Sequence, residues 1–268
     1  MKRVRESLER IGAVVVRHLY LWRGSLPRLI DLIYWPAVHL VLWGLINRFF
    51  TEQGDIAIWA TGFLLAAVLL WDILYRAQLG IAVAFLEELW SRNLGQLFAT
   101  PLRPWEFAVG LVIIGLIRSV VGLSVAAGLA YWLYRYNLFL MGPPLVLFFS
   151  QLQVMGWAVG LFIVAVVLRH GLGAEGFAWA FIFILAPLCG IYYPVAILPD
   201  PIEPLAWLLP ATYVFEGMRQ VLLEGSFNWA FFWNATLLNL LDLLLAILIF
   251  RLAFERAREH NKLLQCGE

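Results

Sequence analysis

Charged residues are scarce in this chain. Of its 268 residues, 14% are Asp, Glu, Lys or Arg and 63% are hydrophobic, and the mean hydropathy is +0.83. A soluble globular domain usually has roughly 25% charged residues. The composition therefore excludes an ordinary soluble domain and predicts a protein with several membrane-spanning segments.

Lysine is almost missing, since Lys2 and Lys262 are the only two lysines. The phosphate-binding loop of an ATPase needs a lysine directly after a glycine-rich turn, and neither lysine follows such a turn. The segment from Gly171 to Gly176 matches the letters of a dinucleotide-binding motif, but it follows an apolar run rather than a strand, so we interpret it as a tight turn. We expect no cofactor in this chain, and any energy that its activity requires must come from a partner protein or from an ion gradient.

Patterns typical of catalysis or metal binding are lacking as well. Cys189 lies in an apolar run and Cys266 in the C-terminal tail, without CxxC spacing, so we expect neither a disulfide nor a metal site. No Ser-His-Asp, paired-Asp or HExxH arrangement is present, which argues against a hydrolytic enzyme. A net charge of +1 argues against a nucleic-acid partner.

Long apolar runs are what the chain has instead. A bilayer core of about 30 Å requires roughly 20 apolar residues in a helix, and runs this long exclude barrel strands. We predict an all-α polytopic membrane protein, one domain of residues 1–268, with six transmembrane helices over residues 29–254. The predicted spans are Leu29 to Phe50, Ala57 to Gly80, Trp105 to Leu133, Pro144 to Leu168, Phe177 to Tyr193, and Trp233 to Phe254.

Positive charge is concentrated before the first predicted span and after the last. By the positive-inside rule, both termini are predicted to be cytoplasmic, including the tail of residues 255–268. Within residues 1–28, apolar residues recur at helical spacing while arginines occupy another face. This pattern predicts an amphipathic helix at the cytoplasmic interface; the alternative is a solvated charged tail.

Asp72 and Arg76 lie inside the second predicted span. Four residues apart on a helix, they can pair, which offsets part of the roughly 2.5–3.5 kcal/mol that each would cost alone. The pair could form a proton relay, a site for a charged cargo or a structural contact. We favour the structural contact, because a relay normally uses several carboxylates or histidines in register. In the fourth span, Gly156 and Gly160 suit close helix packing, either within the chain or between two copies.

Five prolines interrupt the region between the fifth and sixth predicted spans, within residues 194–213. An interior proline removes a helix hydrogen bond and clashes with the preceding turn, so this region cannot be one straight helix. It is also too apolar for an ordinary solvated loop. Broken backbone at membrane depth is tolerated only inside protein or beside a cavity, and we therefore predict a re-entrant helical segment.

A polar segment, Glu87 to Glu106, separates the second and third predicted spans. It reads as a charged helix, a Leu-rich turn, Ala-Thr-Pro and then Trp-Glu at the start of the next span. This order resembles the cytoplasmic coupling helix in permease subunits of type-2 ABC exporters. Residues 190–213 also contain the Gly-x-x-x-Pro, Leu-Pro and Leu-Pro-x-Thr-Tyr elements that form re-entrant helices at the outer gate in that family.

The resemblance implies a multi-pass permease subunit in the bacterial cytoplasmic (inner) membrane. Two copies, expected to be a homodimer, would work with a nucleotide-binding ATPase subunit that binds ATP and Mg²⁺. The other expected partners are membrane lipid and an exported substrate, which is a polysaccharide or glycolipid, a lipid or a drug. A coupling helix of about residues 85–100 would dock on the ATPase through Glu87, Glu88, Arg92, Leu94 and Leu97. The outer gate would include Pro194, Pro199, Pro210 and Tyr213.

Two other classes of protein remain open at this point. An ion-coupled secondary transporter would work without an ATPase and would need its intramembrane carboxylates. A membrane-embedded enzyme or assembly factor would need a convergent set of catalytic residues, which the sequence does not supply.

Overall fold

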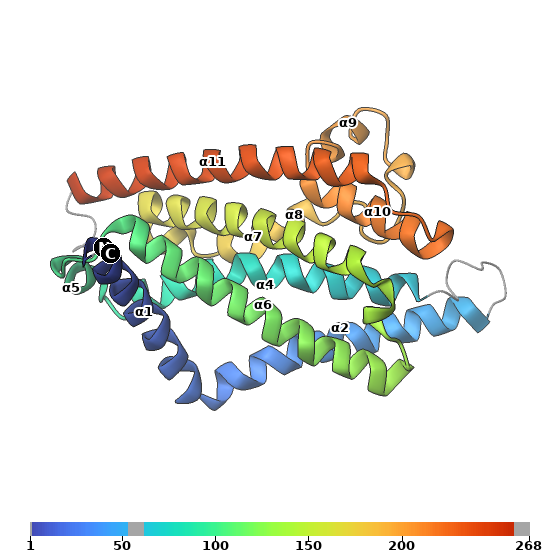
Figure 1. Ribbon diagram of the computed structural model, residues 1–268, viewed down its shortest axis with the longest axis horizontal. Helices are drawn as coiled ribbons and strands as arrows, with labels where there is room; N and C mark the ends of the chain where they lie inside the picture. Colours follow the sequence, from blue (N-terminus) through green and yellow to red (C-terminus); the bar gives the residue numbers. More distant parts are fainter. Residues whose placement is uncertain (1, 53–61, 260–268) are drawn as a thin grey trace.

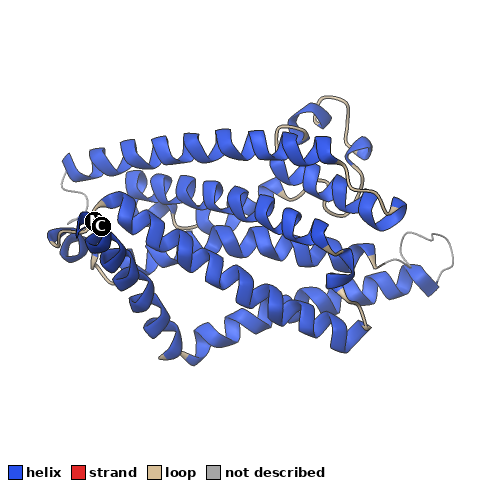
Figure 2. Cartoon of the chain, in the orientation of Figure 1, coloured by secondary structure: helices blue, strands red, loops and turns tan. Residues whose placement is uncertain are grey.

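The computed structural model describes residues 2–52 and 62–259, and all regular structure in these ranges is helical. Figure 2 shows the helices and the short loops that join them. The prediction of an all-α fold is confirmed. The α-helices are α1 (Lys2–Arg23), α2 (Leu26–Glu52), α4 (Phe63–Trp90), α5 (Leu94–Ala99), α6 (Pro104–Tyr134), α7 (Pro143–His170), α8 (Phe177–Leu185), α9 (Glu203–Ala206), α10 (Pro210–Glu224) and α11 (Trp229–Glu259), and the 3-10 helices are η1 (Leu138–Met141), η2 (Gly171–Ala174) and η3 (Val195–Ile197).

Within the described ranges, four helical segments are long and apolar enough to cross a membrane: Phe63–Trp90, Pro104–Tyr134, Pro143–Ala174 and Trp229–Glu259. They extend along the long axis of the molecule (Figure 1). α4 is the central helix, because 94% of its most apolar window is buried and α2, α6, α7, α8 and α10 all contact it.

The predicted count of six spans is not confirmed. α2 covers the first predicted span but is not among the four spanning candidates. The predicted fifth span is helical only in α8, whose 9 residues extend about 13.5 Å at 1.5 Å per residue, less than half of a bilayer core of about 30 Å. The regular helix ends at Leu185, because Pro187 has no backbone N–H with which to continue the hydrogen-bond ladder, although Ala186 keeps helical backbone angles. α4 also continues past the predicted end at Gly80 to Trp90.

The bundle has two distinct ends (Figure 1). At the α5 end lie α5, the start of α1, the η2 turn and the C-terminal part of α11. At the α9–α10 end lie α9, α10 and the start of α11. Each end has its own hydrophobic core, one built around Phe85 and Phe107 and the other around Phe215 and Met218.

Glycines bring the middle of α4 into close contact with α6 and α7. A Cβ atom added to Gly80 would lie 2.5 Å from the Cα of Gly115 in α6, and one added to Gly156 in α7 would lie 2.4 Å from the Cβ of Ala77. Gly160 packs against α4 in the same way, near Ile81. The small residues of α7 therefore serve packing within the chain.

Candidate functional site

The connection between α4 and α6, residues 91–103, is at the α5 end of the bundle. The predicted coupling helix of residues 85–100 consists of two pieces, the last turns of α4 and the six-residue helix α5. Arg92 separates them with a φ of 52°, a left-handed conformation that a helix cannot continue through. The connection is thus a tight turn, a short helix and an extended return to α6.

The predicted docking residues differ in their accessibility. Arg92 is exposed and Leu97 is partly buried, whereas Leu94 and Glu88 are buried within the chain. Glu87, also partly buried, faces the start of α2, where its Oε1 lies 3.1 Å from Nε of Arg28. Of the five, Arg92 is therefore the side chain most available to another protein.

Glu88 fixes the turn to α1. Nε and Nη2 of Arg17 donate to its two carboxylate oxygens at 2.8 and 3.0 Å, and the Asn93 side-chain amide donates to Oε2 at 2.8 Å. A planar guanidinium held by both carboxylate oxygens is among the stronger hydrogen-bonded pairs. The carboxylate therefore joins α1, α4 and the start of α5.

A second bidentate pair joins α1 to α6. Nε and Nη2 of Arg10 lie 2.8 and 2.7 Å from the Glu106 carboxylate oxygens, which also accept the backbone N–H of Arg103 at 2.9 Å. This hydrogen bond to Glu106 raises the pKa of Arg10 above its ordinary value, against a smaller opposing effect of burial. Arg10 and Arg17 are seven residues apart, two helical turns, so both project from one face of α1.

The connection is linked to a second turn at the same end. The indole N–H of Trp90 donates to Glu175 at 2.9 Å, directly after the η2 turn. Beneath the connection is a cavity of about 310 Å³ between α1, α5 and the start of α6. The two turns therefore form one surface, braced from behind by α1.

At the α9–α10 end, the proline-rich segment is broken as predicted. After α8 the chain passes through turns, then η3 and α9, and resumes a longer helix at α10. Pro210 is buried in the first turn of α10, where a missing N–H costs nothing, while Pro194 and Pro199 are exposed. Tyr213 packs against Trp207, with ring centroids 5.0 Å apart.

Arg219 of α10 holds this segment together, and the sequence analysis did not identify it. Its guanidinium is buried and donates to the backbone carbonyls of Gly190 and Tyr193, the latter at 2.6 Å. Glu216, one turn earlier, forms an ion pair with Arg219, with its Oε1 2.8 Å from Nη1, and accepts a hydrogen bond from the backbone N–H of Val195 at 2.7 Å. The spacing of Glu216 and Arg219 was the only signal in the sequence, and it does not indicate the backbone partners.

The intramembrane pair forms as expected. Nε of Arg76 donates to Asp72 at 2.5 Å, and both side chains are buried. Arg76 also packs on Gly122 of α6, where a Cβ atom would lie 2.3 Å from its Cδ. In the described residues, no three His, Cys, Asp or Glu side chains are grouped as they would be to hold a metal ion.

A protein-family model matches the chain over most of its length. Residues 21–223 match the family model of the ABC-2 type transporter. This region includes both the α4–α6 connection and the proline-rich segment. No curated protein matches the chain.

Proposed function

The chain belongs to the ABC-2 type transporter family, and from this we propose that it is the permease subunit of an ATP-driven exporter whose ATPase is a separate polypeptide. As an ABC-2 membrane domain, it is a transport subunit and not itself a hydrolase. We place it in the bacterial cytoplasmic membrane with both termini on the cytoplasmic side. The cargo remains among polysaccharides or glycolipids, lipids and drugs.

The α5 end carries this proposal. It presents the exposed turn at Arg92, together with the Glu175 turn that is hydrogen-bonded to Trp90. A surface that transmits force must not yield when it is pushed, and here the Arg17–Glu88 and Arg10–Glu106 pairs brace it against α1. We propose that the ATPase docks on this surface.

α4 provides the route from this surface to the other end. Its 28 residues form one continuous helix of about 42 Å. A displacement of the connection therefore moves a rigid rod whose far end lies beside α10, which contacts α4. We propose that the proline-rich segment, held by Arg219, is the outer gate that responds.

We propose that a second copy of the chain packs against α8. This helix ends at Leu185, and the turns that follow it leave backbone groups outside any regular helix. Such groups are tolerated at membrane depth only where protein or a cavity covers them. Phe183 and Ile184 are exposed on the same helix, and we propose that the partner copy covers this face.

The test uses two arginines in matched surroundings at opposite ends of the bundle. Arg92 and Arg135 are both exposed and both have positive φ, 52° and 56°, so substitution by Glu strains the backbone equally. Arg92→Glu should abolish co-purification of the ATPase and ATP-dependent transport. Arg135→Glu should leave both intact. Equal binding by the two variants would refute docking at the α5 end.

The buried Asp72–Arg76 pair is the observation on which the alternative of an ion-coupled transporter would rest. A variant in which the pair is neutral tests this alternative. Asp72→Asn with Arg76→Gln keeps a hydrogen-bonding pair without leaving a buried charge unpaired. The proposed exporter should retain ATP-dependent transport in this double variant. Loss of transport with normal folding and normal ATPase binding would instead favour the ion-coupled transporter.

A further inference from the structure

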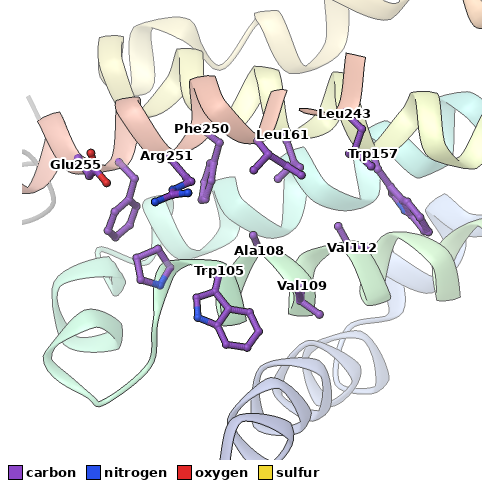
Figure 3. Close-up of a pocket in the computed structure, with 13 residues that line it drawn as sticks. Trp105, Ala108, Val109, Val112, Trp157, Leu161, Leu243, Phe250, Arg251 and Glu255 are labelled. Carbon is purple, nitrogen blue, oxygen red and sulfur yellow. The ribbon is translucent and has the colours of Figure 1, made fainter. Parts of the chain in front are cut away.

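A deep groove separates α6 from α11, with α7 as its floor (Figure 3). Its volume is about 720 Å³, within the range of roughly 300–1,000 Å³ for ligand pockets. The lining is almost entirely apolar, with Val112 on α6, Leu161 on α7 and Phe250 on α11 among its side chains. No α8 residue lines it, so it is separate from the surface assigned to the second copy.

The length of the groove matches one leaflet of a bilayer. Its α11 residues extend from Leu243 to Glu255, twelve steps or about 18 Å along the helix. Half of a bilayer core is about 15 Å. Both α6 and α11 are long enough to cross the membrane, so a groove between them that faces the bilayer is long enough for one extended acyl chain.

Polar groups occur mainly at the mouth of the groove, at the α5 end. Arg251 points from α11 toward α6, and Glu255 lies one turn further on (Figure 3). Neither side chain has a hydrogen bond or ion pair in the described part of the chain. An Arg placed before a Glu at this spacing is the less favourable order for a helix pair. Trp105, exposed at the rim, is of a residue type enriched at the membrane interface.

We propose that this groove binds a bilayer phospholipid with an amine headgroup, such as phosphatidylethanolamine. The acyl chain lies along the apolar lining, the phosphate accepts hydrogen bonds from Arg251, and the ammonium group pairs with Glu255. A guanidinium is well suited to bind phosphate. The neighbouring carboxylate disfavours a headgroup that has negative charge only.

The groove does not need a protein to cover it. α6 and α11 are continuous helices here, and such helices satisfy their own backbone hydrogen bonds in lipid. The lipid would also contact Phe254, whose ring is 4.7 Å from that of Phe98 in α5. The bound lipid therefore adjoins the α4–α6 connection.

Native mass spectrometry of the full chain, released from detergent with added phosphatidylethanolamine or phosphatidylglycerol, tests the proposal. The wild type should retain phosphatidylethanolamine preferentially. Arg251→Ala should weaken retention of both lipids about tenfold, as expected for a lost charge-assisted bond. Glu255→Gln should remove only the preference. Arg258→Ala, which removes a charge outside the groove on the same helix, is the matched control. No headgroup preference, or an equal effect of Arg258→Ala, would overturn the proposal.

Two further variants identify the occupant independently of charge. Ala108→Trp should fill the groove and abolish crosslinking of a photoactivatable acyl chain to α6 and α11, while the protein still folds. In a background without Cys189 and Cys266, Val109→Cys, also in the lining, should give no disulfide-linked dimer in membranes. Efficient dimer formation would show that a second copy occupies the groove and would overturn lipid binding.

Discussion

Arginines stabilise both ends of the bundle, but they bind different partners at each. At the α5 end, Arg10 and Arg17 bind carboxylates on other helices. At the α9–α10 end, Arg219 binds backbone carbonyls of the irregular segment before α10. The α5 end is therefore held together by ion pairs between side chains, and the α9–α10 end by hydrogen bonds from a side chain to the main chain.

This difference determines what each end can do. An ion pair between an arginine and a carboxylate can separate and re-form without unfolding a helix. The Arg17 side chain is 43% exposed, so water can take the place of Glu88 beside it. The carbonyls bound by Arg219 belong to turns with few other partners, and leaving such groups unpaired is costly. The helices at the α5 end therefore stay folded even when one pair breaks, which suits a docking surface braced by several pairs, whereas the α9–α10 end depends on Arg219 for its internal structure.

The largest expected effect is that cysteines placed at the two ends of the bundle react with a labelling reagent from opposite sides of the membrane. In a background without Cys189 and Cys266, cysteines replacing Glu203 or Glu224 should react with an impermeant reagent added outside intact cells. A cysteine replacing Thr100 should react only after the membrane is opened. Labelling of all three from one side would contradict the assignment of the ends.

Arg219→Leu should cause the largest loss of stability, about 3–5 kcal/mol, as for breaking a buried ion pair. The neighbouring Cys189 is a fully buried free cysteine, so its thiol is shielded from reagents while the segment stays folded. In a Cys266→Ser background, the variant should speed thiol labelling and lower the melting temperature. Arg219→Lys, with fewer donors, should be intermediate; a wild-type melting curve for Arg219→Leu would refute the role of Arg219.

Glu88→Gln should have a smaller effect, about 1–2 kcal/mol, because its partner Arg17 is partly solvated. The loss should be local, so α1 should loosen while the rest of the bundle remains folded. Limited trypsin digestion should then cleave after Arg17 or Arg23 faster than in the wild type. Glu224→Gln, an exposed change at the other end, serves as control, and similar digestion of both variants would show that Glu88 does not hold α1.

Arg5→Ala should have the smallest effect, below about 0.5 kcal/mol. Arg5 and Glu9 form an exposed pair four residues apart on α1, and such pairs contribute little. Thermal unfolding should be indistinguishable from the wild type. A shift as large as that of Glu88→Gln would mean that exposed charge, and not the buried carboxylate, holds α1 in place.

Structural features that depend on residues close together in the sequence were predicted from local patterns. The apolar runs gave the all-α class, the prolines gave the break before α10, and the spacing of Asp72 and Arg76 gave their ion pair. The helix of α1 was predicted from its apolar stripe, while its place at the membrane interface stays a prediction. The predicted count of six spans is not confirmed, since the fifth predicted span is helical only over the 9 residues of α8; hydropathy counts apolar residues and does not register where a helix ends.

Contacts between distant residues could not be predicted. Arg10 and Glu106 are 96 residues apart and Arg17 and Glu88 are 71 apart, and nothing local shows which base meets which acid. The partners of Arg219 are carbonyls, which every residue has. The turn at Arg92 was also missed, since a positive φ is uncommon for arginine and no glycine marked the position.

We expect α4 to pivot at its glycine contact with α6. The two backbones approach closely at Gly80 and Gly115, with only the Ile81 side chain packed beside Gly115. The contact divides α4 into arms of unequal length, about 15 Å toward Trp90 and about 26 Å toward Phe63 at 1.5 Å per residue. If α4 tilts as a rigid body about this point, a small displacement of its Trp90 end therefore produces a displacement of its Phe63 end that is opposite in direction and about 1.7 times larger. Spin labels at both ends of α4, compared with and without ATP, would measure this lever ratio directly.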